Sequence, residues 1–561
     1  MILGANRLRY EPLTAYIERR PGVIAATLCA LWMIPGLIGR DPWKPDEAFV
    51  FGVVYQMILS GDWSVPALAG ETYLRNPPFY YLSAALVGKM LSPLLPLHDA
   101  VRLVNALFGA LTFGLLAMAA QVLNGAGRGW IAPLLLLGSV GLVFPAHLLV
   151  PDNALLTAFA AALYGLAIIP RFPARGGLVV GTGIGLAFMS KGLAGSAALL
   201  LGFGLMPVMA PHMRNRATLV AAAAALGAAV PWLAIWPATL YFSAPHLFAE
   251  WFAADLGRYF GVESLLSDRG NPLYYLGVIP WFAWPVLPFA AWTLWHARRN
   301  LTEPAIIVPL TIFGAALLVL SGSHERREIL ALPLLAPLTL LAVPRIKTVP
   351  RGGQYAFFWF SIVFFLFFIA AVWFYWLAVE FGVPARLAAH MAAMEPGYEP
   401  VLSIPLMVVA ALLTVAWVVF MFNVRRSPER PLLAWTAGGT AFWAVLMTLL
   451  IAFVDNAKSY RDMIDSLVAA LPAKRGCIVS VSLGESQRAL LHYFAGITTL
   501  RVEAGHAPQS CDLLFIEGTV DRGRMTSPWT LMWEGHRAGD GRERYRLYRD
   551  SGVTDAGREQ P

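Results

Sequence analysis

Two adjacent carboxylates, Asp46 and Glu47, stand at the head of a largely apolar stretch, AFVFGVVYQMIL. Pro45 directly before them is typical of a helix start, so both acids fall in the first helical turn. The positive end of the helix dipole favours the ionised form of a carboxyl group there. Carboxylates held in this way suit a general base or a metal ligand, and a plain helix cap is the alternative.

A third acid and a lysine lie at the ends of other apolar segments. Asp152 follows Pro151 and opens one such segment, where helix capping is the alternative role. Lys191 lies between two apolar segments in MSKGLAG, where its ammonium group could instead reach the lipid head groups. Further cations that could act with these groups are Arg75, Arg102, Arg258, Arg326 and Arg327.

Together these charges suit chemistry on a lipid-linked phosphate. Arginine and lysine stabilise the charge on a leaving phosphate, while a carboxylate handles the incoming group. Some of these cations also fit purely structural roles. Arg102 is suited to the end of a membrane span, and the Arg326-Arg327 pair could be neutralised by Glu325 and Glu328 in the same loop.

The composition predicts a polytopic helical membrane protein. The chain has 561 residues, of which 58% are hydrophobic and 14% charged. Soluble domains are about half apolar and a quarter charged. Apolar runs long enough to cross a bilayer recur through the first 455 residues. The net charge of +8 is spread over short loops, so the positive-inside rule accounts for it better than a nucleic-acid partner does.

Windowed hydropathy predicts thirteen membrane spans. They are 22–39, 102–123, 130–149, 153–169, 176–190, 192–210, 217–237, 273–296, 303–321, 327–343, 355–379, 400–422 and 431–454. Segment 78–96 is apolar enough for a fourteenth. If it spanned the membrane, the Arg- and Lys-bearing loops would all move outside, so we expect an interfacial helix instead.

Thirteen spans place the predicted site on the outer face of a bacterial inner membrane. The N-terminus is then cytoplasmic, and the first loop (40–101) and a second long loop (238–272) are periplasmic. Residues 1–454 form a transmembrane domain in this scheme, and residues 455–561 a periplasmic one. Nucleotide-activated substrates are absent from the periplasm.

The last 107 residues predict a small α/β domain. The predicted elements are helix 457–471, strand CIVSVS, helix 484–495, strands TTLRVE and CDLLFIEG, and a closing pair WTLMWEGHR and RYRLYRD. Cys477 and Cys511 each stand at the start of a predicted strand, and we expect a disulfide between them in the oxidising periplasm.

The first loop carries a family resemblance. The segment DPWKPDEAFVFGVVYQMILSGDWSVPALAGETYLRNPPFYYLSAAL resembles the first external loop of the C superfamily of membrane glycosyltransferases. The similarity is to the branch that contains protein O-mannosyltransferases and lipid A aminoarabinose transferases. The residues that carry it are Trp43, Asp46-Glu47, Gly61-Asp62-Trp63, Asn76-Pro77-Pro78, Tyr80-Tyr81 and, further on, Arg102, Pro151-Asp152, Lys191, Arg258 and Pro280-Trp281.

This resemblance implies sugar transfer from a polyprenyl-phosphate carrier at the outer face. Asp46 would be the catalytic carboxylate, with Glu47 and Asp152 beside it. Lys191 and Arg258 would hold the donor phosphate, and Arg75 would stand in for the family's lysine before Pro-Pro. Arg326 and Arg327 are further candidates for the phosphate, and Tyr80, Tyr81 and Arg102 for other parts of the substrate.

We therefore expect an inner-membrane glycosyltransferase with a periplasm-facing lipid or glycan acceptor, lipid A being one candidate. A divalent cation at Asp46, Glu47 and Asp152 is an alternative that no ligand spacing requires. A transferase of the same family acting on a protein or an O-antigen is a second alternative. Other classes are a flippase of lipid-linked sugars and a non-catalytic assembly protein.

Overall fold

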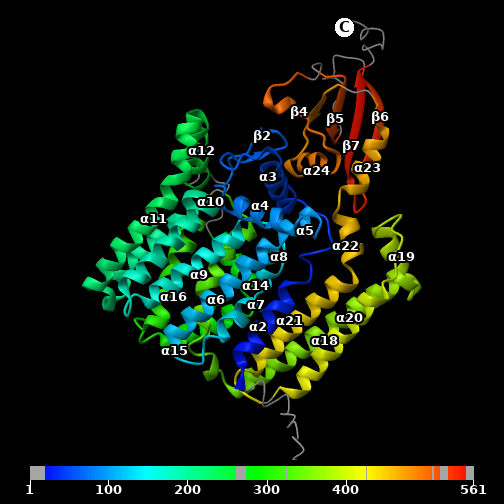
Figure 1. The fold of residues 1–561 in the computed structure, drawn as a ribbon. Helices are drawn as coiled ribbons and strands as arrows, with labels where there is room; N and C mark the ends of the chain where they lie inside the picture. The colour runs from blue at the N-terminus through cyan, green and yellow to red at the C-terminus, as the bar shows by residue number, and fades with distance from the viewer. Residues whose placement is uncertain are drawn as a thin grey trace, which may run out of the picture.

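The computed structural model describes residues 19–260, 273–323, 325–424, 426–473, 476–507, 511–518 and 529–550. Helices lie in every one of the thirteen predicted spans (Figure 1). Within these ranges seven helices are long and apolar enough to cross a membrane. They are α5–α6 (Leu97–Asn124), α10 (Pro173–Met209), α11 (Arg216–Ser243), α16 (Pro304–Ser321), α18 (Arg351–Phe381), α20 (Ile404–Asn423) and α21 (Arg430–Leu449).

The remaining predicted spans are shorter or interrupted. Single helices are α2 (Pro21–Met33) and α9 (Asp152–Ile168). Segment 130–149 divides into α7 (Ile131–Leu137) and α8 (Val143–His147), and segment 327–343 into a 3₁₀ helix, Glu328–Leu334, and α17 (Leu335–Ala342). Segment 273–296 is bent by 105° between α14 (Tyr274–Phe282) and α15 (Val286–Ala297). Pro285 lies in this bend, where a proline cannot supply the backbone N–H that a continuous helix needs.

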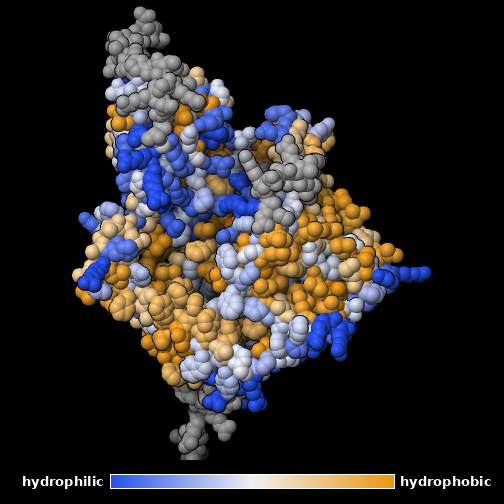
Figure 2. All heavy atoms as spheres, turned by 180° about the vertical axis from the view of Figure 1, so that it is seen from behind, coloured by the Kyte–Doolittle hydropathy of each residue, from blue (hydrophilic) through white to orange (hydrophobic). Residues whose placement is uncertain are grey.

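The outer surface of the helices is a broad hydrophobic band. Figure 2 shows this band, with hydrophilic residues gathered above it and at the opposite end of the molecule. Long exposed apolar side chains on α18 and α20 contribute to it, among them Phe367 and Phe422. The protein is therefore a multi-pass membrane protein, as the composition predicted.

The helix that begins at Asp46 is short and firmly bounded. Helix α3 (Asp46–Ser60) starts after Pro45, and it ends at Gly61, whose φ of 72° closes the helix in the left-handed conformation. A hairpin of β1 (Ala67–Leu68) and β2 (Glu71–Thr72) follows, and then α4 (Phe79–Leu91). With 13 residues, α4 is about 20 Å long, which is too short to cross roughly 30 Å of hydrocarbon.

The C-terminal unit consists of α22 (Ile451–Lys458), α23 (Arg461–Ala470), α24 (Glu485–Ala495) and one five-stranded sheet. The strands are β3 (Ile478–Val481), β4 (Leu500–Arg501), β5 (Leu513–Glu517), β6 (Trp529–Arg537) and β7 (Asp540–Asp550), in the order β4-β3-β5-β7-β6. Strand β3 is parallel to β4 and β5, whereas β7 is antiparallel to β5 and β6. The predicted helix 457–471 is two helices here, because the chain turns between Lys458 and Arg461.

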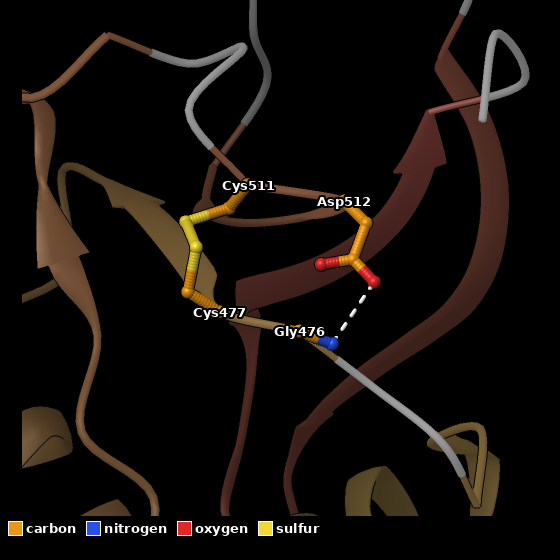
Figure 3. The surroundings of a disulfide bond; sticks show 4 residues. All are labelled: Gly476, Cys477, Cys511 and Asp512. Atoms are coloured by element: carbon orange, nitrogen blue, oxygen red, sulfur yellow. Dashed lines mark hydrogen bonds between the residues drawn. A yellow bond between two sulfur atoms is a disulfide. The ribbon is translucent and has the colours of Figure 1, made fainter. Parts of the chain in front are cut away.

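The predicted disulfide is present. Cys477 and Cys511 lie at the start of the neighbouring parallel strands β3 and β5, with their Cα atoms 5.0 Å apart (Figure 3). Beside them the Gly476 N–H donates to a carboxylate oxygen of Asp512 at 3.0 Å, which joins the same two strand starts (Figure 3).

Candidate active site

One pocket collects most of the charges singled out in the sequence. Its lining includes Asp46 from the first turn of α3 and Arg75 from the loop after β2. Asp152 comes from the first turn of α9, Lys191 from α10 and Arg327 from the segment before the 3₁₀ helix. Residues more than 280 positions apart in the chain thus meet at one place, as the transfer hypothesis requires.

Each acid of the pocket is paired with a cation. Asp46 forms an ion pair with Arg327, and Asp152 accepts from the Lys191 ammonium at 2.8 Å. Asp152 is only 2% exposed, and its second carboxylate oxygen has no hydrogen-bond partner among the described residues. Such an oxygen is costly to leave unbonded, so this part of the pocket is suited to a further donor from a ligand.

Glu325 is a pocket residue that the sequence suggested only as a neutraliser of its neighbours. Arg75 donates to its carboxylate at 2.8 Å, and Arg327 lies 3.7 Å from the same oxygen. Partial burial favours the neutral acid, but Arg75 and Lys191 outweigh it and lower the pKa of Glu325. The pocket therefore holds three acids and three cations. Arg326 is not among the residues that line it.

Lys191 is presented by a break in α10. Lys191 and Gly192 leave the helical conformation, with a φ of 64° at Gly192. A Cβ built on Gly195 would lie 2.5 Å from the Ala187 carbonyl oxygen. In a continuous helix these residues would be about 12 Å apart, so the two halves of α10 fold back on each other, as the separate spans 176–190 and 192–210 predicted.

Asp255 fixes this turn, and the sequence analysis missed it. It lies on α12 (Pro245–Phe260), where its buried carboxylate accepts the Leu193 N–H at 2.9 Å and so caps the second half of α10. A Cβ on Gly192 would approach the same carboxylate to 2.4 Å, so only glycine fits there. The predicted phosphate ligand Arg258 lies on the same helix, and its side chain is outside the described part of the chain.

Glu47 faces away from the pocket. Its carboxylate accepts from Arg40 at 3.1 Å, from Arg102 at 2.7 Å and from the Trp43 N–H at 3.0 Å. Burial alone would favour the neutral acid, but the two guanidinium groups lower the pKa of Glu47 to about 2. Arg102 also donates to Asp99 at 2.8 Å. The structure thus places Glu47 and Arg102 in a buried ionic network that does not line the pocket.

The two predicted tyrosines are fully buried beside the pocket. The Tyr80 hydroxyl donates to Asn105 at 2.6 Å, and the Tyr81 hydroxyl accepts from Asn76 at 3.3 Å. Neither ring is among the groups that line the pocket, whereas Asn76 is. Tyr81 therefore supports the loop that carries Arg75.

The predicted metal ligands do not assemble. Asp46 and Asp152 line the pocket, but Glu47 is held by its two arginines. Across the described ranges no group of three His, Cys, Asp or Glu side chains could hold a metal ion. We derive no step through a metal.

An apolar groove of about 480 Å³ adjoins the pocket. Ile329 lines both spaces, and Glu328 stands beside it in the groove. The rest of the groove is mainly aromatic and aliphatic, with side chains from α8, α14, α18 and α21 that include Phe144, Phe282, Phe364 and Phe442. A charged pocket that shares a wall with such a groove fits a molecule with an anionic head and an apolar chain.

No family model matches the chain. It is 28% identical over 333 residues to undecaprenyl phosphate-alpha-4-amino-4-deoxy-L-arabinose arabinosyl transferase 1 of Sodalis glossinidius, covering 57% of each chain. It is 26% identical over 350 residues to transferase 2 of the same name from Proteus mirabilis, covering 58% of this chain and 60% of that one. These matches thus span less than two thirds of the curated relatives.

The fold agrees with a solved structure over nearly the whole chain. The crystal structure of ArnT from Cupriavidus metallidurans bound to undecaprenyl phosphate superposes with a TM-score of 0.68. The match covers 95% of this chain and 98% of that one, at 17% identity. The chain therefore has the fold of that ArnT structure. The resemblance predicted from residues 41–86 is confirmed.

Proposed function

We propose that the protein transfers a 4-amino-4-deoxy-L-arabinose-type sugar from undecaprenyl phosphate to lipid A at the periplasmic face of a bacterial inner membrane. The observation that carries the proposal is the charged pocket around Asp46 beside the apolar groove, with Ile329 lining both. The names of the similar proteins from Sodalis glossinidius and Proteus mirabilis support the choice of donor.

The proposed topology follows the charge distribution of the loops. The N-terminus lies in the cytoplasm, and the pocket and the C-terminal unit lie in the periplasm. Residues 1–454 form the transferase domain in this proposal, and residues 455–561 a periplasmic domain. The short length of α4 supports it, because a helix of 13 residues adds no further crossing.

In the proposed reaction the acceptor oxygen attacks the anomeric carbon of the sugar. The bond from that carbon to the phosphate oxygen breaks as the new bond to the acceptor oxygen forms, with inversion. Asp46 takes the proton of the acceptor oxygen, and undecaprenyl phosphate leaves with the bonding electrons. Lys191, Arg75 and Arg327 stabilise the charge on that phosphate, and Arg258 stays a predicted contact.

The ion pairs of the pocket also indicate how the base becomes available. Arg327 pairs with Asp46, and Arg75 pairs with Glu325. A phosphate that binds these arginines competes with both carboxylates for the same donors. Donor binding therefore releases Asp46 from Arg327, and the acid becomes free only when the leaving group is in place.

The test is transfer in proteoliposomes from radiolabelled undecaprenyl-phosphate aminoarabinose to lipid A, followed by mass spectrometry of the product. The purified protein should label lipid A. Asp46→Asn should lower the rate by about a thousandfold, because the acceptor proton loses its base. Thermal stability of this variant should stay near that of the wild type.

Asp62→Asn is the matched control. Asp62 is an exposed acid in the same loop, and among the described residues its carboxylate accepts only from Ser64 and the Val65 N–H of its own turn. This variant should transfer at the normal rate. Sugar that crosses the bilayer without reaching lipid A would indicate a flippase instead, and full activity of Asp46→Asn would remove the assigned base.

A further inference from the structure

The segment directly before Asp46 is held by the C-terminal unit. The Asp41 carboxylate accepts from Arg461 at 2.9 Å and from the Ser459 hydroxyl at 2.7 Å. The Asp41 N–H in turn donates to Asp455 at 2.9 Å. These three partners lie more than 410 residues further along the chain.

The contacts continue residue by residue towards the acid. The Trp43 indole N–H donates to the same Asp455 oxygen at 2.7 Å. Lys44 forms an ion pair with Glu543, and the Pro45 carbonyl accepts from the Ser486 hydroxyl at 2.8 Å.

Helix α3 also packs directly against the C-terminal unit. Ala48, two residues after Asp46, belongs to the hydrophobic core that Leu490 and the strands of the C-terminal sheet form. One helical turn later, a Cβ on Gly52 would lie 2.4 Å from the Ala489 Cβ, so the two helices touch. Figure 1 shows α24 beside α3, with the sheet above both.

A second group of contacts leads to the other side of the pocket. Glu71 forms ion pairs with Arg488 and Arg501, each at 3.0 Å. Tyr73, two residues before Arg75, donates to Glu485 at 3.2 Å. The unit thus holds both the segment that ends at Asp46 and the segment that ends at Arg75.

We propose that the C-terminal unit is a positioning element of the transferase, which sets the place of Asp46 through its contacts with residues 41–45. The proposal rests on the proposed function. Each of these hydrogen bonds contributes only modestly to stability, so removing one of them should leave the chain folded. A displacement of about 1 Å at a reacting group can lower a rate about a hundredfold, so the same contacts matter far more to transfer.

Asp455 offers the sharpest test. One of its oxygens accepts both the Asp41 N–H and the Trp43 indole N–H. Asn keeps an oxygen that can accept both bonds, whereas Ala removes them. We expect Asp455→Ala to lower kcat at least tenfold with donor KM within twofold of wild type. Asp455→Asn should stay within threefold of wild-type kcat, which a purely electrostatic role would not allow.

Two further variants define the specificity of the effect. Ser486→Ala removes the bond to Pro45 and should lower kcat about threefold. Glu534→Ala is the matched control, because Glu534 is exposed and pairs only with Arg544 and Arg546 of the neighbouring strand β7 among the described residues. It should transfer at the wild-type rate.

Hydrogen exchange measures how firmly the C-terminal unit holds the segment around Asp46, and it needs no transfer assay. Amides of residues 41–52 should exchange faster in Asp455→Ala than in the wild type, with exchange in α9 unchanged. Unchanged exchange in residues 41–52, or wild-type kcat in both Asp455→Ala and Ser486→Ala, would overturn the proposal. A wild-type protein that transfers no sugar would instead refute the proposed function. Hydrogen exchange alone would then decide whether the C-terminal unit holds residues 41–52 in place.

Discussion

Asp46 and Glu47 are neighbours in the chain, but their carboxylates lie in opposite surroundings. Asp46 lines a pocket, and among the described residues its one side-chain partner is Arg327, which is itself partly exposed. Glu47 is buried and bound by two arginines and a backbone N–H. Asp46 has few partners and is open to the pocket, so it can exchange its partner for another. Glu47 has more partners and is buried, so it cannot.

The same difference separates the two arginine groups. Arg75 and Arg327 each pair with an acid at the edge of the pocket, where a phosphate can replace that acid. Arg40 and Arg102 are 3% and 1% exposed, and they bind Glu47 together with backbone carbonyl groups. The cations that we propose to bind the donor phosphate are therefore partly exposed, while those that hold the loop are buried.

The largest effect on stability should come from Glu47→Ala. It leaves two buried guanidinium groups without their shared acid, and breaking a buried ion pair costs about 3–5 kcal/mol. We expect a large fall in the thermal midpoint measured in detergent, and little folded protein. A Glu47→Ala protein that folded normally would show that the network does not hold the loop.

A smaller effect, on binding, should come from Lys191→Ala. In the proposed complex the Lys191 ammonium pairs with the donor phosphate, and removing one partner of such a charge pair costs about 2–5 kcal/mol of binding. We expect donor KM to rise at least thirtyfold in the transfer assay. Lys89→Ala, at an exposed lysine on α4, should leave it unchanged. Equal values for both variants would place the phosphate elsewhere.

The smallest effect should be a pH dependence of stability due to Glu47. Its pKa is about 2 in the folded protein and 4.5 as the ordinary value, so the ionised form stabilises the fold above pH 4.5. This contribution is lost as pH falls towards 2, because the unfolded chain binds the proton first. Between pH 7 and pH 4 the loss should be about 1 kcal/mol.

Differential scanning fluorimetry at both pH values checks this. The Glu47→Gln variant has no carboxylate at this position, so it should lack the part of the stability loss that is due to Glu47. An equal fall in both proteins would assign the pH dependence to other groups.

Much of the fold could be predicted from local patterns. Long apolar runs mark helices wherever the chain crosses a bilayer, and all thirteen predicted segments contain helices. Alternating strands and the two cysteines at strand starts predicted the C-terminal sheet and its disulfide. The breaks within segments 130–149 and 273–296 were missed, because hydropathy reports burial in lipid and not the continuity of backbone hydrogen bonds.

Most of the charged residues of the pocket could be predicted, but some of the groups that complete it could not. Asp46, Asp152, Lys191, Arg75 and Arg327 stood out because charges are rare among apolar segments, and the pocket contains them all. Glu325 and Asp255 did not stand out as site residues. Each gains its importance from a partner on a distant segment, Arg75 for Glu325 and the Leu193 N–H for Asp255.

The amino-acid sequence alone was enough to predict a membrane protein with a charged outer face and an acid at the start of α3. It could not show which of two successive acids faces the pocket. Successive residues on a helix point about 100° apart, and only the packing of α3 against α24 and α4 fixes that rotation. Tertiary packing therefore brings Asp46 to Lys191 and Arg327, while Glu47 meets Arg40 and Arg102.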